Sequence, residues 1–355
     1  MKKKYICLGV ASLITGLSLN AQTINENMSA DVELGFLNKQ FSSQSNDKNF
    51  STGIVNLTLE NKFTNELKVN LGFRSNQKLD QIDNYYDDTH KESSMLYDGN
   101  ISYENDFVNI IVGRQWIDME WLGYIHEAAL ATLKTIPDTL VTVGYTSRIS
   151  FTDEDEIGTF NKDFGDTGAY IFNTNYQGIK DTSAELFYFD APDLFNAYGL
   201  KLDYTNSVFG LTGRYALTNE QNLNVDGDVY HFEGRYTISG LNLKAGYLVT
   251  DKDGGSGSLR KLGGNLVPFF EEGYQIYEVD AKTAYFGADY TFNELELIAL
   301  YGQTDYGNNH ADELNLKFNY PLTSKLTLSP VYANINSNES SYDYDIFKTY
   351  VTYKF

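Results

Sequence analysis

Cysteine, proline and long apolar runs are scarce in this chain of 355 residues. It contains 1 Cys and 5 Pro, and Cys7 lies within the apolar stretch 5–19 near the amino terminus. A chain that loses this stretch has neither a disulfide nor a reactive thiol. No Pro-rich or Ser-rich linker divides the remainder, which indicates one domain. Beyond residue 19, no apolar run reaches the about 20 residues that a membrane-spanning helix needs.

The first 21 residues have the pattern of a secretory signal peptide. Lysines precede the apolar stretch, and the small residue Ala21 stands before Gln22. We expect cleavage at this point, which leaves 22–355 as a single domain. A membrane anchor is the alternative, but the apolar stretch is shorter than a spanning helix. Cys7 is not at the cleavage position, so the pattern is not that of a lipoprotein.

Basic residues are few compared with acidic ones. The chain has 27 Lys and Arg against 48 Asp and Glu, a net charge of −21. Nucleic acid is therefore an unfavourable partner, because phosphate binding needs clustered positive charge. The acidity is explained either by solvated loops or by an outer rim that attracts small cations.

Enzymatic and metal-binding motifs are missing as well. The sequence has 4 His and no HExxH, CxxC, GxSxG or Walker pattern. We expect no enzyme activity and no cofactor. A loop-bound Ca²⁺ at the acidic run 153–156 is a weak alternative to a solvated loop, since no motif supports it. Segment 251–254 resembles the start of a calcium loop, but Leu262 stands where such a loop needs its acidic twelfth ligand. His231 is interpreted as a pore or rim residue.

What the chain does contain is alternation of apolar and polar residues. Leu67, Val69, Leu71 and Phe73 share one face of segment 66–75. Similar segments recur at 139–150, 208–217, 229–238, 241–249 and 313–320. Their length of about 10 residues suits a tilted membrane strand, and 28 Tyr with 22 Phe can supply interfacial girdles. A soluble sandwich shares the alternation but also needs strands that are apolar on both faces. The pattern predicts an all-β transmembrane antiparallel barrel.

The connections between these segments alternate in length. Short turns rich in Asn, Asp, Gly, Pro and Ser are expected near 64–65, 105–106, 137–138, 178–181, 205–207, 239–240, 293 and 321–325. Longer links separate them, at about 41–49, 77–93, 116–125, 151–167, 190–194, 218–227, 251–279, 306–311 and 337–344. This organisation predicts about 18 strands, with 16 as the alternative. Short periplasmic turns and long extracellular loops are typical of outer-membrane barrels.

The carboxyl terminus resembles the strand that closes such a barrel. Residues 350–355 alternate polar with aromatic or apolar side chains, and the chain ends in Phe. Tyr353 and Phe355 would face lipid and form the signal read by the barrel-assembly machinery. Outer-membrane lipid and lipopolysaccharide are the expected surroundings.

The polar residues that alternate with apolar ones along each strand are assigned to the lumen, because a charge on the lipid face costs about 2–4 kcal/mol at mid-membrane. The candidate pore residues are Arg74, Arg148, Arg214, Arg235 and Glu233. A wide barrel holds water, and mixed charges along its wall orient polar solutes. Each charge taken alone could instead pair with a neighbour.

Segment 116–124 contains both tryptophans of the chain. We expect this loop to fold into the pore as a constriction, with Asp118 and Glu120 facing the passage and Trp116 and Trp121 anchoring it. The alternative is an aromatic anchor at the membrane interface.

Three short motifs lie between residues 113 and 148: Gly113-Arg114-Gln115, Trp121-Leu122-Gly123 and Gly144-Tyr145-Thr146-Ser147-Arg148. With the signal peptide and the terminal Phe, they resemble the Opr family of outer-membrane porins, relatives of OprD and of the Campylobacter-type major outer-membrane protein. The resemblance implies an 18-stranded porin, often a homotrimer, with an inward third loop and a ladder of arginines. This chain has few candidate arginines and is acidic.

These observations together predict an outer-membrane channel for passive diffusion of small hydrophilic solutes and ions, with a preference for cations. The alternative is a structural or adhesive barrel whose surface loops bind a ligand. The small, polar residues of the inward parity favour the water-filled channel.

Overall fold

The computed structural model describes residues 28–41, 48–82, 84–90, 92–153, 156–221, 225–264, 270–339, 341 and 343–355. The predicted signal peptide, 1–21, and its cleavage site lie outside these residues. Glu154 and Asp155 of the acidic run 153–156 lie outside them too.

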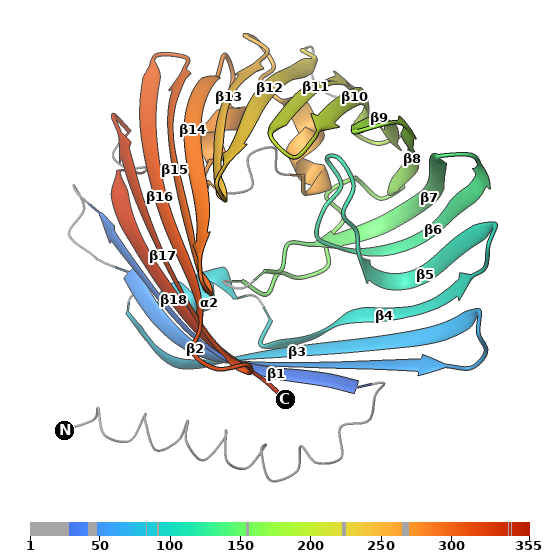
Figure 1. Ribbon diagram of the computed structural model, residues 1–355, viewed down its shortest axis with the longest axis horizontal. Coiled ribbons are helices and arrows are strands. Elements are labelled where there is room, and N and C mark those ends of the chain that lie inside the picture. The colour runs from blue at the N-terminus through green and yellow to red at the C-terminus, as the bar shows by residue number, and fades with distance from the viewer. Residues whose placement is uncertain are drawn as a thin grey trace.

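The described chain forms one antiparallel sheet of 18 strands. The strands surround a central opening, as Figure 1 shows. They are β1 (Met28–Phe41), β2 (Lys48–Lys62), β3 (Leu67–Ile82), β4 (Ser94–Glu104), β5 (Val108–Trp116), β6 (Ile125–Ile136), β7 (Thr139–Ser150), β8 (Ala169–Ile179), β9 (Thr182–Ala191), β10 (Phe195–Thr205), β11 (Phe209–Glu220), β12 (Gly227–Ile238), β13 (Leu241–Thr250), β14 (Lys282–Phe292), β15 (Leu295–Tyr306), β16 (Asn309–Pro321), β17 (Leu326–Ser337) and β18 (Tyr344–Lys354).

The first and last strands close the sheet into a barrel. β1 pairs with both β2 and β18, and Val32 lies opposite Tyr353. The backbone N–H of Phe355 donates to the carbonyl of Ala30 at 3.1 Å. The closed barrel and its 18 strands are confirmed, and the alternative count of 16 is wrong.

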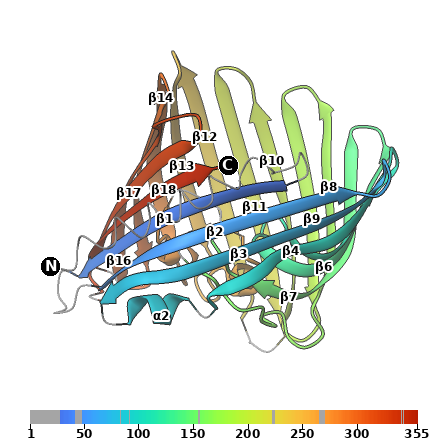
Figure 2. The same ribbon diagram turned by 90° about the horizontal axis from the view of Figure 1, so that it is seen from below.

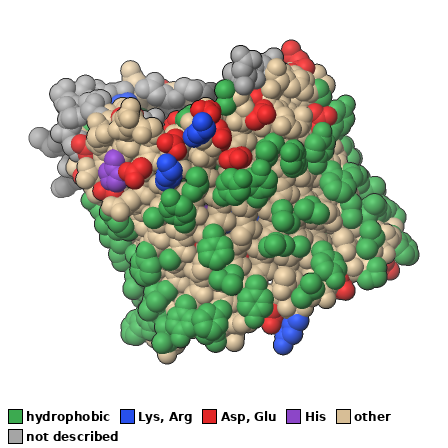
Figure 3. All heavy atoms as spheres, turned by 90° about the horizontal axis from the view of Figure 1, so that it is seen from above, with side chains coloured by type: hydrophobic (Ala, Val, Ile, Leu, Met, Phe, Trp, Pro, Cys, Tyr) green, Lys and Arg blue, Asp and Glu red, His purple; other side chains and the backbone are tan. Residues whose placement is uncertain are grey.

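The outer face of the barrel is apolar, as the alternation requires. Phe73, Phe209, Phe232 and Phe286 are exposed there, and their polar neighbours along each strand point inward. On the face drawn in Figure 3, hydrophobic side chains form a band, and most charged ones lie along the upper edge, with a few at the lower edge. This is the surface that a lipid bilayer covers.

No helix among the described residues is long and apolar enough to cross a membrane.

Turns join the strands at one end and longer loops at the other. All eight predicted short turns are found between the strands where we expected them. One predicted outer link is wrong: 306–311 is not a loop, because Tyr306 pairs with Asn309 and only two residues turn between β15 and β16. Gly307 adopts φ 54°, which a tight hairpin requires and glycine adopts freely.

Several outer loops fold into the barrel. Leu122, Leu259 and Leu262 from these loops share a buried cluster with Leu248 and Leu300 of the inner wall. The loop after β13 contains two short 3₁₀ helices, η2 (Gly257–Leu262) and η3 (Tyr274–Tyr277). Helix α2 (Tyr85–Thr89) lies at one end of the barrel beside β2 and β3, as Figure 2 shows. The loops therefore narrow the lumen from the outer side.

Candidate pore and its lining

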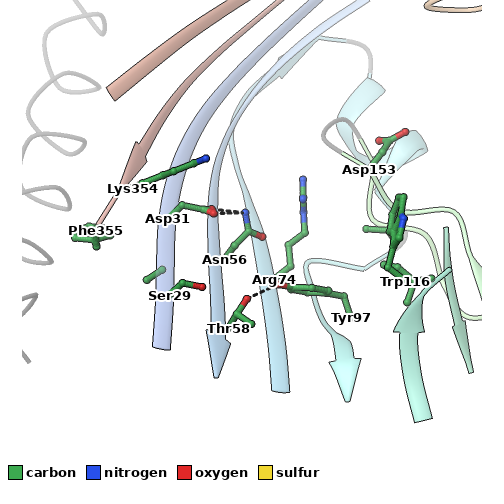
Figure 4. Close-up of a pocket in the computed structure, with 13 residues that line it drawn as sticks. Ser29, Asp31, Asn56, Thr58, Arg74, Tyr97, Trp116, Asp153, Lys354 and Phe355 are labelled. Atoms are coloured by element: carbon green, nitrogen blue, oxygen red, sulfur yellow. Dashed lines mark hydrogen bonds between the residues drawn. The ribbon is translucent and has the colours of Figure 1, made fainter. Parts of the chain in front are cut away.

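A cavity of about 710 Å³ extends along the inner side of the first strands. Ser29 and Phe355 line it near the end where the chain terminates, and Thr152 and Asp153 line it among the loops. Figure 4 shows Arg74 pointing from the strand wall into the space that Trp116 borders on the loop side. The cavity is the candidate passage through the barrel.

The wall of this cavity is a row of polar side chains in register. Asp31, Asn56 and Arg74 lie directly opposite one another on β1, β2 and β3. Asn56 Nδ2 donates to Asp31 Oδ2 at 2.8 Å. On the next strand, the hydroxyl of Tyr97 lies 2.7 Å from that of Thr58. Alternation along β3 directs Arg74 inward, so the sequence predicted the orientation of this member of the row.

Arg74 is the member of the predicted arginine set that lines this cavity. Its Nε and Nη2 atoms have no hydrogen-bond partner among the described residues. Both atoms are buried, and Arg74 lines the cavity without a carboxylate partner among the described residues, in contrast to the arginines considered below.

Trp116 reaches the cavity because the sheet divides at its position. Pairing of β4 with β5 ends at Gly99 and Arg114, whereas β5 continues to pair with β6 as far as Trp116 and Ile125. The tip of β5 thus separates from β4, and the indole borders the cavity with 58 % of the residue exposed. The predicted anchoring by burial is not seen for this tryptophan.

The loop 117–124 packs on the opposite inner wall. Glu120 Oε1 lies 2.9 Å from Arg214 Nε, without the alignment of a hydrogen bond, and Oε2 lies 3.3 Å from Lys201 Nζ. Its backbone N–H donates to Glu185 Oε1 at 3.3 Å. The Glu120 side chain is only 8 % exposed. The carboxylate that we expected to face the passage is therefore turned into the wall.

The other residues predicted on this loop differ from Glu120. Trp121 is buried, and its ring meets Tyr277 edge to face at 6.0 Å. Asp118 is exposed, and no hydrogen bond joins its side chain to the part of the chain that the structure describes. Of the two predicted carboxylates, Asp118 is the one that remains open to solvent.

A second loop, 251–281, supports the first, and sequence reasoning missed this contact. The N–H of Gly123 donates to the carbonyl of Leu262 at 3.1 Å, and Leu122 bridges to Gly263. A Cβ on Gly264 would lie 2.4 Å from Trp121 Cα. The consecutive glycines and buried leucines of 259–264 were the available signal for a close backbone approach.

A chain of hydrogen bonds runs from Arg214 to Glu233 along the barrel wall. Arg214 Nη1 donates to His231 Nδ1 at 2.7 Å, because arginine has no acceptor. His231 Nε2 then donates to the Tyr285 hydroxyl at 2.8 Å, which donates to Glu233 Oε2 at 2.6 Å. His231 is buried in the wall rather than open to the pore.

The remaining predicted arginines are paired with carboxylates. Arg235 lies 2.8 Å from Asp203 and 3.5 Å from Glu233. Arg148 pairs with Glu127 near the outer end of β6 and β7. Of the four predicted arginines, Arg74 therefore lines the cavity, whereas the other three each lie beside a carboxylate.

A second cavity of about 430 Å³ lies among the outer loops. Its charged lining consists of Asp153, Glu156, Glu271, Glu272 and Arg260. Asp153 lines both cavities, so the two are neighbours. The upper cavity, called here the vestibule, carries more negative than positive groups.

The vestibule is held across the barrel by ion pairs and hydrogen bonds. Glu271 pairs with Lys348, and Glu272 lies 3.6 Å from Lys39. The N–H groups of Glu272 and Gly273 donate to the buried Glu313 at 3.0 and 2.9 Å. These contacts fix the acidic segment against β1, β16 and β18.

In the described part of the chain, no three His, Cys, Asp or Glu side chains are placed to hold a metal ion. Asp251 accepts the N–H groups of Asp253 and Gly254 at 2.8 and 2.7 Å. These bonds, the one from Gly254 first, hold the pKa of its carboxyl below the usual range. This carboxylate closes a turn.

Comparison with known proteins agrees with this geometry. The sequence profile described as Gram-negative porin matches residues 9–341. A search of the curated proteins finds no match to the sequence.

Solved structures share the fold at low identity. OccAB4 of Acinetobacter baumannii is 14 % identical with TM-score 0.72, covering 95 % of this chain and 100 % of that one. For OpdO of Pseudomonas aeruginosa the values are 16 %, 0.73, 94 % and 99 %. For OpdK of Pseudomonas aeruginosa, solved with vanillate, they are 15 %, 0.70, 94 % and 99 %. The profile match over nearly the whole chain shows that this protein belongs to the Gram-negative porin family and is an outer-membrane channel for small solutes.

Proposed function

We propose that this porin is a passive channel that prefers cations. The supporting observation is the vestibule, where Asp153, Glu156, Glu271 and Glu272 face one basic residue, Arg260. Asp153 lines both cavities, so a solute that passes from the vestibule to the lower cavity crosses this excess of negative charge.

The physical basis is focusing of the field by a narrow aqueous space with low-dielectric walls. Two of the carboxylates, Glu271 and Glu272, are offset by Lys348 and Lys39. The preference is therefore moderate rather than strict, and it should weaken as salt screens the charges over about 10 Å at 0.1 M. The lower cavity, with Asp31 and Arg74 on its wall, adds no large excess of either sign.

The test is the reversal potential of purified protein in planar bilayers under a KCl gradient. We expect cation preference at low salt that declines at high salt. Asp153→Asn with Glu156→Gln should reduce it, whereas Asp181→Asn, a matched charge loss in a turn at the opposite end, should have a smaller effect. Anion preference of the unmodified protein at low salt contradicts the proposal.

We also infer that the barrel-assembly machinery reads the terminal strand, and that the channel forms a homotrimer. Tyr353 and Phe355 form an edge-to-face pair at 5.0 Å at the end of this strand, which supports recognition of the strand by the assembly machinery. The trimer rests on the family resemblance, and cross-linking in intact outer membranes tests it.

A further inference from the structure

The two tryptophans of the chain have opposite environments. Trp121 is 3 % exposed and Trp116 is 58 % exposed, although they lie close together in sequence. A large apolar side chain left open in a concave site marks a place where something binds. Trp116 borders the 710 Å³ cavity rather than the lipid face, so bilayer contact does not explain its exposure.

The surroundings of Trp116 specify the charge of its ligand. Asp153 lines the same cavity, and Figure 4 shows both side chains on the loop side of it. The Tyr124 ring lies 5.8 Å from the indole, tilted by 51°, which supports the indole while leaving much of it open. An electron-rich aromatic face and a carboxylate on the same side of one cavity attract a cation of low hydration, and indole is the best of the aromatic side chains for this purpose.

We propose that Trp116 and Asp153 form a binding site for the ammonium group of small organic cations at the outer end of the cavity. The site rests on the proposed cation preference, because the acidic vestibule delivers such ions to it. Arg74 on the opposite wall disfavours a second positive charge. The ligand is therefore a monovalent primary or quaternary ammonium compound rather than a diamine.

Intrinsic fluorescence provides a direct test because each single replacement leaves one indole. In Trp121→Phe, Trp116 is the reporter, and tetramethylammonium chloride should change its emission relative to KCl at equal ionic strength. In Trp116→Phe, the buried Trp121 is the reporter and should not respond. Asp153→Asn in the Trp121→Phe background should weaken the response about 3- to 10-fold. Heat-modifiability on gels establishes that each variant is an assembled barrel.

Bilayer recordings give an independent readout. Tetramethylammonium should block or slow the potassium current of the unmodified channel, and Trp116→Ala should remove most of this effect. An equal response of Trp116 to benzoate or to maltose overturns recognition by charge. Cation preference in KCl without any tetramethylammonium response overturns the site and leaves the proposed function intact. Anion preference in KCl overturns the proposed function, while a fluorescence response in Trp121→Phe would still support the site.

Discussion

Glu120 joins its loop to Arg214 across the inside of the barrel, with 2.9 Å between Oε1 and Nε. The same carboxylate lies 3.3 Å from Lys201. One acidic side chain thus pairs with two basic residues of β10 and β11 and holds the loop 117–124 against the wall. Removing one partner from such a largely buried ion pair costs about 3 kcal/mol, because the remaining charges stay desolvated.

Glu120→Gln should therefore release the loop and uncover two positive charges. We expect a noisier open-channel current and a reversal potential shifted toward anions, both measured in planar bilayers. Asp118→Asn is the matched control, since it removes an exposed carboxylate from the same loop. It should lower cation preference slightly and leave the noise unchanged. Equal noise in the two variants would contradict the role of Glu120 as a latch.

The strand pattern was predictable because its determinants are local. Alternation sets which residues face lipid, and turn residues set where strands end, so β2, β3 and their neighbours lie where the sequence indicated. The wrong link at 306–311 has a local cause too: Gly307 permits a two-residue hairpin where polar residues suggested a longer loop.

The lining of the pore was less predictable, because it depends on contacts between distant segments. Nothing near Glu120 in sequence indicates Lys201 or Arg214 as partners. The exposure of Trp116 follows from where β5 leaves β4, which no local pattern encodes. Asn56 was missed as a cavity residue because polar inward positions are numerous, and only packing selects among them. Tyr97 was missed because it lies at a register shift between β3 and β4, which pairs Gly72 with Asp98 and Phe73 with Leu96 and so interrupts the alternation.

Two glycines provide a test of the barrel wall. Gly113 has φ 128°, and a Cβ there would lie 2.2 Å from the carbonyl oxygen of Gly99. Gly213 faces open space, with nothing within 4 Å of an added Cβ. We expect Gly113→Ala to destabilise the barrel by more than about 1 kcal/mol, through backbone strain and the clash with β4.

Gly213→Ala should leave the stability of the barrel nearly unchanged. For both variants, stability is measured as the temperature at which the folded band disappears from heat-modifiability gels. A Gly113→Ala protein as heat-resistant as the unmodified one would show that β4 and β5 can adjust at this point.

The terminal residue should matter for assembly more than for conduction. Phe355 packs on Tyr353 and donates its N–H to Ala30, so it completes the seam between β18 and β1. Deleting it should reduce the amount of folded barrel in the outer membrane, measured by surface labelling, and this loss should exceed any change in the unit conductance of channels that do insert. Phe355→Tyr keeps the aromatic ring and should restore assembly. Normal surface levels of the truncated chain would count against this prediction.

Helix α2 is docked by a histidine that burial keeps neutral. The His90 ring stacks on Tyr86 at 3.9 Å and meets Phe50 edge to face at 5.4 Å. Asn76 Nδ2 donates to His90 Nε2 at 2.8 Å, so Nδ1–H donates to the Tyr86 carbonyl at 3.2 Å. Burial, with a smaller contribution from Arg74, lowers the pKa of His90 from 6.5 to about 4, although the Tyr86 carbonyl, Asp153 and Asp87 oppose the shift.

The sign of the resulting pH dependence follows from this lowered pKa. Between pH 6.5 and about 4, an undocked His90 binds a proton and the docked one does not, so docking weakens as the pH falls through this window and is fully restored above it. The loss reaches at most about 3 kcal/mol. Amide hydrogen exchange of Tyr85–Thr89, corrected for its intrinsic pH dependence, should accelerate on acidification in the unmodified protein. His90→Gln removes the titrating group, and its exchange should show no such acceleration. If that variant responds to acid as strongly as the unmodified protein, the carboxylates around α2 and not His90 control the docking.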